Sequence, residues 1–221
     1  MSVLPSPSIQ LARSLEVAEN DVEKLTALDL FKLQMESNNT EAAVDAMKRL
    51  AVVGVLSGPE ATQSVLLPYL QTVVNSPNVS DEILLILGQQ IFDVYKITKS
   101  QAEILVILEK LATVEETVVR NQAVNVMNQL MEYNEQNKQG GATPFLGVLK
   151  RLASAEWFTA KVSSCGLFGN LLKNIPSLPV QHELLSIFKD LCADDTPMVR
   201  RAAAQNLSSV LKHAGWDHRD F

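Results

Sequence analysis

Apolar residues recur every three or four positions along most of the chain, and short polar stretches interrupt them. A clear example lies toward the C-terminal end, where Leu184, Phe188 and Leu191 share one face of a predicted helix. The polar stretch that follows contains Thr196 and Pro197, which suit an N-cap and a first helical position. The apolar spacing then resumes. This pattern predicts two helices joined by a tight acidic turn.

The same helix–turn–helix pattern returns at regular intervals. When the second helices are aligned on one small or apolar position, the spacings are 39, 38, 41 and 39 residues. The aligned positions are Ala46, Leu85, Ala123, Ser164 and Ala203. A period of about 40 with two helices per unit is typical of HEAT and armadillo repeats. The chain is therefore predicted to be all-α, an α-solenoid of about five HEAT repeats or repeats of the armadillo type, whose antiparallel helix pairs stack in a right-handed superhelix.

The period also sets expected boundaries. First helices are expected near residues 25–36, 62–74, 101–112, 144–153 and 180–192, and second helices near 41–56, 81–97, 117–134, 158–173 and 197–213. The repeats would then cover 25–62, 63–100, 101–143, 144–179 and 180–221, after an N-terminal tail over 1–24. Because each repeat buries its apolar face against its neighbours, we expect one architectural unit rather than separate globular domains.

Composition narrows the class of partner and the cellular location. Of 221 residues, 47% are hydrophobic but only 5% are aromatic, which suits helices packed by aliphatic side chains. A net charge of −6 argues against nucleic acid or an anionic membrane as the main partner. Apolar runs such as "EILLILGQQIF" are too short to span a bilayer, and no secretory signal is visible. Cys165 and Cys192 lie in helical patterns without a CxxC motif, which favours reduced core thiols in a cytosolic or nuclear protein.

The sequence shows no catalytic or metal-binding pattern. His182, His213 and His218 are scattered along it. His213 and Asp217 could share a helix face, but a third ligand is missing and Gly215 is expected to end the helix. There is neither a glycine-rich phosphate loop nor a Gly-x-Ser-x-Gly motif. We therefore predict a protein that is not an enzyme and that binds no cofactor or metal.

Three stretches carry a more specific resemblance. "LEKLATVEETVVR", "LKRLASAEWFTAKVSSCGLF" and "LCADDTPMVRRAAAQNL" closely resemble consecutive HEAT repeats of the scaffolding (65-kDa regulatory) subunits of protein phosphatase 2A, and the resemblance runs in order from about residue 25 to 213. It implies a non-catalytic scaffold whose N-terminal repeats hold an exchangeable regulatory B-type subunit. The catalytic subunit would bind only through later repeats, which are absent from this chain.

The resemblance also implies which residues contact the regulatory B-type subunit. The matching positions are Glu115, Glu116, Trp157, Phe158, Asp195, Pro197 and Arg201. Acids on successive turns would align into a stripe that steers a basic partner surface. Thr117 is expected to cap its helix, which would leave both glutamates of that turn free.

The aromatic pair in the fourth turn has two interpretations. Trp157 and Phe158 are adjacent, so both cannot enter one helix interface, and one of them is available as an interface anchor. Alternatively, both fill the seam between neighbouring repeats. Pro197 likewise has a structural role as a helix-start residue, whether or not a partner contacts it.

A basic residue recurs three positions before the aligned column, as Arg120, Lys161 and Arg200. We expect Arg200 to bond acids of the adjacent turn, with Asp194 part of the same structural ladder between repeats. Arg201 has no basic counterpart in the other repeats, so it is the better candidate for a partner contact.

Two other functions remain open from the sequence. A nuclear-transport or other HEAT or armadillo adaptor would share the architecture and recognise an extended peptide or a GTPase. An enzyme built on a helical-repeat body is the third interpretation, against which the missing catalytic pattern argues.

Overall fold

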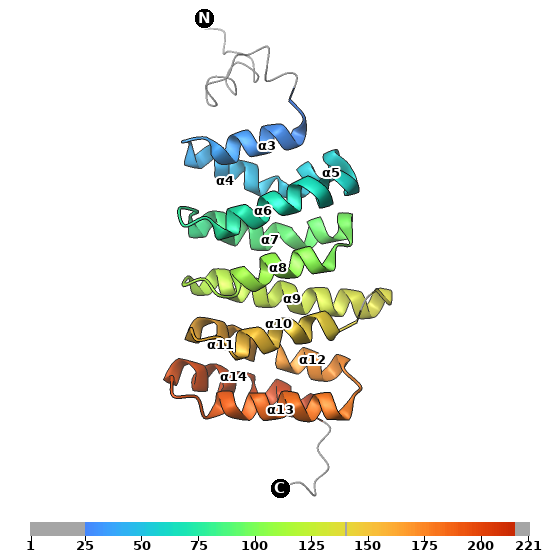
Figure 1. Ribbon diagram of the computed structural model, residues 1–221, viewed down its shortest axis with the longest axis vertical. Coiled ribbons are helices and arrows are strands. Elements are labelled where there is room, and N and C mark those ends of the chain that lie inside the picture. Colours follow the sequence, from blue (N-terminus) through green and yellow to red (C-terminus); the bar gives the residue numbers. More distant parts are fainter. Residues whose placement is uncertain (1–24, 140, 215–221) are drawn as a thin grey trace, which may run out of the picture. The chain divides into compact units, whose positions relative to one another are not determined.

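The computed structural model describes residues 25–139 and 141–214, and within these ranges every regular element is a helix (Figure 1). The predicted tail over 1–24 lies outside the described residues, as do Asp217 and His218. The prediction of an all-α solenoid of HEAT-type helix pairs is confirmed. The chain divides into two compact units, Met1–Ile104 and Leu105–Phe221, in place of the single unit expected from repeat stacking. The division falls inside α8 (Gln101–Leu111).

The first helix pair of unit 1 departs from the predicted boundaries. Its first helix, α3 (Ala27–Glu36), begins at a capping box formed by Thr26 and Asp29. Its second helix changes direction at Arg49, where α4 (Thr40–Lys48) gives way to α5 (Leu50–Ala61). The connection expected after residue 56 is only a sharp bend, because Gly58 alone leaves helical geometry, with φ 81° and ψ 165°.

The second helix pair of unit 1 starts with one turn of π-helix, η1 (Thr62–Leu66), and continues through α6 (Leu67–Asn75) and α7 (Asp81–Thr98). The Thr62 hydroxyl donates a hydrogen bond to the Gly54 carbonyl at 3.0 Å, which fixes the entry of this pair against α5. Both α4 and α5 pack on α7. The largest fully buried side chains between these helices include Phe31, Met47, Leu50, Leu66, Leu67, Leu70, Leu87 and Ile91.

One described stretch, Leu50–Asn75, is long and apolar enough to cross a membrane by length and composition, so the expectation that the apolar runs are too short was wrong on that criterion. The stretch contains the bend at Gly58 and the start of a new helix pair. Leu66, Leu67 and Leu70 within it are fully buried in the core of unit 1. Packing therefore explains the apolar character of these leucines, whereas Val52, Val55 and Leu56 of the same stretch are exposed.

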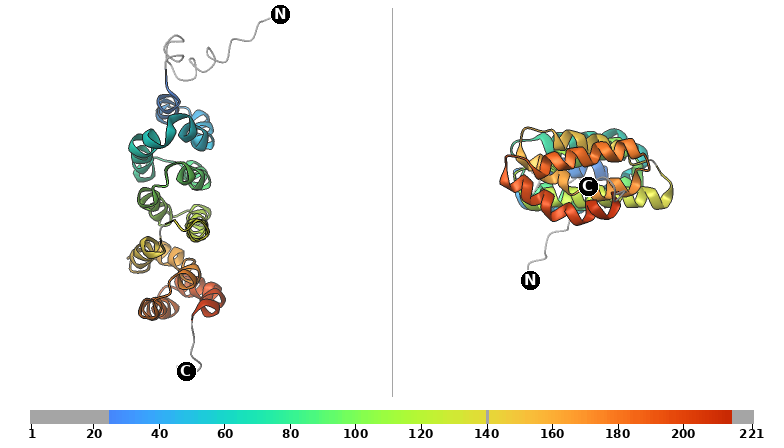
Figure 2. Two further views of the ribbon diagram at one scale, coloured as in Figure 1. Left: turned by 90° about the vertical axis from the view of Figure 1, so that its right-hand side faces the viewer. Right: turned by 90° about the horizontal axis from the view of Figure 1, so that it is seen from below.

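Unit 2 holds the remaining repeats. Its helices after α8 are α9 (Thr117–Asn137), α10 (Thr143–Ala153), α11 (Phe158–Cys165), α12 (Phe168–Asn174), α13 (Leu178–Cys192) and α14 (Pro197–His213). The second helix of the fourth repeat is thus split into α11 and α12 at Gly166 and Leu167. Figure 2 shows these helices in two layers, with the first helix of each pair in one and the second in the other.

Aliphatic and phenyl side chains fill the core of unit 2. The rings of Phe168 and Phe188 meet edge to face, with centroids 5.1 Å apart, and join α12 to α13. Cys165 is buried there, and burial raises the pKa of its thiol to about 12. Cys192 is exposed, so the prediction that both cysteines are core residues holds only for Cys165.

Candidate partner-binding surface

The third turn is built around a buried arginine. Arg120 is 6% exposed, and its guanidinium donates to the carbonyls of Val114 and Glu115 and to the Thr117 hydroxyl. Burial lowers the pKa of Arg120, and the nearby Glu116 carboxylate opposes that shift. Both carbonyls belong to the turn between α8 and α9 and lie outside either helix. The turn is therefore held from inside by a cation.

The carboxylates of the third turn have different roles. Glu116 is the N-cap residue of α9, and its carboxylate accepts a hydrogen bond from Val118 N at 3.3 Å. The expectation that Thr117 caps this helix and leaves both glutamates free was therefore wrong. Thr117 instead accepts from Arg120, whereas the Glu115 side chain is exposed to solvent.

The fifth turn also has an arginine that donates to carbonyls of its own turn, but this arginine is exposed to solvent. Arg200 is exposed, and its Nη1 donates to the carbonyls of Asp194 at 2.7 Å and Asp195 at 2.9 Å. The expectation that Arg200 bonds acidic side chains of an adjacent turn was wrong, since both acceptors are backbone carbonyls of its own turn. Thr196 is the N-cap residue and Pro197 the first residue of α14, as predicted, but the threonine side chain makes no cap bond.

Lys161 provides the ionic link between neighbouring repeats that was expected from the recurring basic residues. Lys161 Nζ on α11 lies 2.8 Å from Asp194 Oδ2 in the next turn. The same carboxylate group accepts a hydrogen bond from Thr196 N at 2.8 Å. These two donors, the lysine first, lower the pKa of Asp194. Asp194 therefore fixes the fifth turn against the fourth and is not a free partner contact.

Two hydroxyls tie the fourth turn to the third. The Thr159 hydroxyl donates to the Thr113 carbonyl at 3.1 Å, and the Ser163 hydroxyl donates to the Ala112 carbonyl at 2.7 Å. Together with Lys161, these bonds set the register of three consecutive turns within unit 2. The groups that the turns display are therefore held in fixed positions relative to one another.

Large apolar side chains stand exposed beside the acids on these turns. Trp157 is 75% exposed, Met198 60% and Val118 53%. Phe158 is half-buried. The alternative in which both aromatics fill the seam between repeats therefore does not describe Trp157. Tryptophan is among the residue types that most often anchor a protein interface.

We call the exposed groups on the three turns the turn surface. It consists of Glu115, Val118, Glu156, Trp157, Asp195, Pro197, Met198 and Arg201. No hydrogen bond or ion pair to Arg201 is seen within the described ranges, so its guanidinium is available to a partner. The structure thus brings together Glu115, Trp157, Asp195, Pro197 and Arg201 as exposed groups, and it assigns Glu116 a capping role.

Sequence reasoning missed Val118 and Met198. Both lie five positions before the aligned small residue of their repeat, where the fourth repeat has the buried Thr159. Apolar residues in this column, directly after a charged turn, were a usable signal. The helical apolar pattern alone had accounted for both residues, so neither stood out as a surface group.

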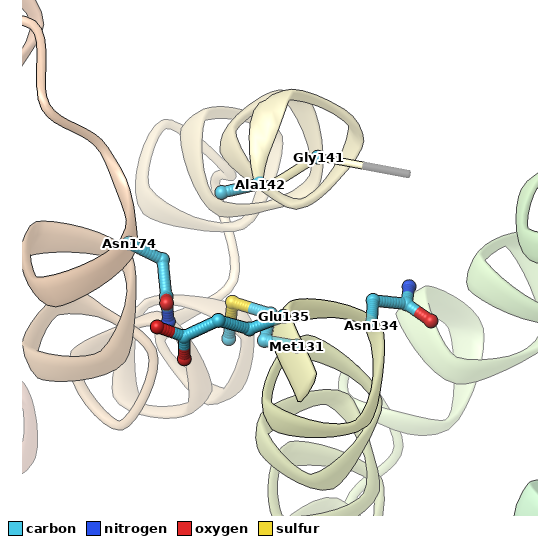
Figure 3. A pocket seen from close by; sticks show the side chains of 6 residues that line it. All are labelled: Met131, Asn134, Glu135, Gly141, Ala142 and Asn174. Atoms are coloured by element: carbon cyan, nitrogen blue, oxygen red, sulfur yellow. The ribbon is translucent and has the colours of Figure 1, made fainter. Parts of the chain in front are cut away.

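A small cavity of about 150 Å³ lies at the opposite ends of these helices, beside the connections between repeats (Figure 3). The Asn174 and Glu135 side chains point toward each other across it, and the buried Asn174 Oδ1 has no hydrogen-bond partner within the described ranges. The lining includes one ionisable side chain, Glu135, so no acid–base pair is assembled there. The described residues also contain no cluster of three potential metal ligands.

Comparison with known proteins finds a matching family model and several relatives. A HEAT repeat family model matches residues 184–214. The chain is 35% identical over 192 residues to the A-type regulatory subunit of protein phosphatase PP2A from Saccharomyces cerevisiae, covering 86% of this chain and 30% of the yeast protein. It is 36% identical over 182 residues to the beta isoform of the 65 kDa A-type regulatory subunit of serine/threonine-protein phosphatase 2A from Homo sapiens, covering 81% of this chain and 29% of the human protein.

The chain is a homologue of the 65 kDa regulatory subunits of protein phosphatase 2A. The resemblance inferred from the turn motifs is thereby confirmed. A third relative, the 65 kDa regulatory subunit of Drosophila melanogaster, is 34% identical over 183 residues and covers 81% of this chain. The chain spans about 30% of the length of the relatives it matches.

These relatives are named regulatory subunits, which supports the prediction that the chain is not itself an enzyme. Because these alignments cover more than four fifths of the chain, they include the turns that carry Glu115 and Trp157. The three exposed turns of unit 2 are the surface on which a partner of such a homologue is best sought.

Proposed function

We propose that this chain is a non-catalytic scaffold segment of a protein phosphatase 2A-type complex, and that its turn surface binds an exchangeable regulatory B-type subunit. The proposal rests on homology to the 65 kDa regulatory subunits and on the resemblance of the turn motifs. Its location would be the cytosol or the nucleus, as the thiols predict. An adaptor for transport cargo has no specific observation in its favour.

The observation that carries the proposal is the exposure of Trp157 between two carboxylate-bearing turns. Hydrogen bonds from Thr159 and Ser163 hold its helix against the third turn, so the backbone that carries the indole is already ordered before a partner binds. The flanking exposed acids, Glu115 and Asp195, offer charge complementarity to a basic partner. An aromatic anchor within a polar rim is the usual anatomy of a specific interface.

The first test is Trp157→Ala, measured by surface plasmon resonance against a purified B-type subunit. We expect about a 30-fold or greater loss of affinity, equivalent to about 2 kcal/mol, with an unchanged helical circular dichroism spectrum. Leu178→Ala is the matched control, since Leu178 is 60% exposed at the start of α13, away from the turns. Equal affinities for the wild type and the Trp157 variant would contradict the proposed surface.

The division of labour between repeats gives a second test. Because the repeats that the resemblance assigns to the catalytic subunit lie outside this chain, we expect the chain alone not to retain a purified catalytic subunit. Titration of one purified protein with the other checks this directly. Sub-micromolar affinity for the catalytic subunit would show that the assignment of functions to repeats is wrong.

A further inference from the structure

A second surface of unit 2 lies away from the turns. An open hollow of about 390 Å³ lies across the second helices of three consecutive repeats, α9, α12 and α14. Its lining comes from the C-terminal halves of these second helices, whereas the turn surface lies at their N-terminal ends. The hollow is lined mainly by amides, charges and glycine, so its recognition chemistry is polar.

Two glycines at the floor of the hollow let side chains of neighbouring helices pack directly against them. A Cβ atom built on Gly169 would lie 2.0 Å from Ser209 Oγ, and one on Gly166 would lie 2.7 Å from Val124 Cγ1. The helices approach each other so closely at these two positions that a side chain does not fit. The Ser209 hydroxyl covers Gly169 at the floor, so a ligand would meet polar side chains there as well as at the rim.

Two asparagines are held in place at this floor. Asn128 Nδ2 donates to the Gly166 carbonyl at 3.1 Å, and Asn170 Nδ2 donates to Asn128 O at 3.2 Å and Oδ1 at 3.3 Å. A side-chain amide has two donor hydrogens and two acceptor lone pairs. These bonds leave Asn128 one donor hydrogen and at least one lone pair, enough to pair with a peptide backbone group.

Charged residues repeat along the rim with the period of the fold. Glu132, Lys173 and Lys212 each lie nine positions after the aligned small residue of their repeat. Lys173 Nζ lies 3.4 Å from Glu135 Oε2, an exposed pair that a ligand carboxylate can replace. No ion pair to Lys212 is seen in the part of the chain that the structure describes, and His213 lies beside it. Lys212 therefore places a positive charge at the α14 end of the rim, and Glu132 a negative charge at the α9 end.

We propose that this hollow binds an extended acidic peptide segment of a partner protein. One carboxylate would pair with Lys173 and another with Lys212, while Asn128 and Asn170 hydrogen-bond the peptide backbone. Extended grooves across stacked repeats are the surfaces on which such arrays commonly bind chains. The inference does not depend on the proposed function, since it uses no residue of the turn surface.

The geometry sets the spacing of the two acids. Neighbouring packed helices lie about 8–10 Å apart, and an extended chain advances about 3.3 Å per residue. Two acids three residues apart would therefore match one repeat step between Lys173 and Lys212. The net charge of −6 repels an acidic peptide from the rest of the surface, so binding should be local to this rim.

The test uses a fluorescein-labelled peptide, Gly-Ser-Glu-Ser-Gly-Glu-Ser-Gly, titrated with the full chain by fluorescence anisotropy at low ionic strength. We expect it to bind at least about tenfold more tightly than the same peptide with glutamine for glutamate. Lys212→Glu should lower its affinity about tenfold or more. Lys189→Glu, an exposed lysine on α13, is the matched control and should change the affinity less than about twofold.

Three outcomes would overturn the proposal. They are equal binding of the glutamine peptide, equal losses from Lys212→Glu and Lys189→Glu, and displacement of the peptide by an equimolar amount of inorganic phosphate. The last result would indicate a general anion site. Trp157→Ala should leave peptide binding unchanged, which separates this inference from the proposed function. Circular dichroism melting of Lys212→Glu establishes that the variant is folded.

Discussion

The turns of the two units differ in the side chains that hydrogen-bond their free backbone N–H and carbonyl groups. In unit 1, short neutral side chains do so: Asn39 accepts from Ala42 N at 3.1 Å, and Ser80 accepts from Ile83 N at 3.4 Å. In unit 2, the third and fifth turns also fold around arginines that donate to their carbonyls. A neutral cap satisfies helix N–H groups, whereas an arginine satisfies the carbonyls that precede the helix.

This difference has a consequence for recognition. A carbonyl-bound guanidinium leaves the neighbouring carboxylates without an obligatory internal partner, so Glu115 and Asp195 remain exposed. It also places a positive charge in the same turn, which reduces the repulsion among the acids. Neutral caps such as Asn39 do neither. The arginine-based turns are therefore better suited to display acids to a partner.

The largest effect on this comparison is expected from Arg120. Arg120→Met keeps the apolar stem but removes a buried cation that donates to two carbonyls and a hydroxyl. We expect the free energy of unfolding to fall by about 2–3 kcal/mol, because hydrogen bonds to charged groups are worth about 1.5–3 kcal/mol and the carbonyls would be left unpaired. Urea unfolding followed by circular dichroism measures the loss.

Two control variants sharpen that prediction. Arg200→Met removes an exposed guanidinium, and water can replace its bonds, so we expect a loss of about 0.5–1 kcal/mol. Asn39→Ala in unit 1 removes a neutral cap and should cost about 1 kcal/mol. If Arg200→Met cost as much stability as Arg120→Met, burial of the guanidinium would not determine how much each arginine contributes.

Periodicity was enough to predict the helix pairs, because each repeat must bury one apolar face at a fixed spacing. It could not predict the bend at Arg49 or the split at Gly166, since both depend on packing against neighbouring helices. The role of Glu116 was missed because glutamate is not a favoured N-cap and Thr117 is adjacent. The acceptors of Arg200 were missed because a guanidinium can bond carbonyls as readily as carboxylates.

A charge reversal tests whether the displayed acids act in recognition. Glu115→Arg combined with Asp195→Arg changes two exposed side chains and leaves the cap at Glu116 and the ion pair at Asp194 intact. We expect about tenfold weaker binding of a B-type subunit, equivalent to about 1.4 kcal/mol, and nearly unchanged stability. The loss should shrink as salt rises, since exposed charges are screened over about 10 Å at 0.1 M.

The matched control for this reversal lies in unit 1. Glu41→Arg reverses an exposed acid in the first turn of α4, where the cap is neutral. Surface plasmon resonance at two ionic strengths should show little change for this variant. If Glu41→Arg weakened binding as much as the double reversal, net charge rather than the turn surface would control association.

The smallest effect is expected at the link between the fourth and fifth turns. Lys161 pairs with Asp194, whose side chain is 12% exposed, so the pair is shielded but not deeply buried. Lys161→Met should lower the free energy of unfolding by about 1 kcal/mol or less near pH 7. Lys150→Met breaks the more exposed pair with Glu183, at 2.7 Å, and should cost less still.

The dependence on pH distinguishes this ion pair from a simple packing contact. Lys161 lowers the pKa of Asp194 below its usual 3.8. The carboxylate therefore stays ionised to a lower pH in the native state than in the unfolded chain. The stabilisation is therefore complete above that value and is lost as the pH falls through the lower native-state pKa. Wild type and Lys161→Met should differ by a constant amount from pH 7 to about pH 5, and the gap should shrink below pH 3.8. Urea unfolding across this range measures the gap. A gap that stayed the same at the lowest pH would show that Lys161 contributes through its aliphatic stem, and that the fourth and fifth turns are joined by packing rather than by charge.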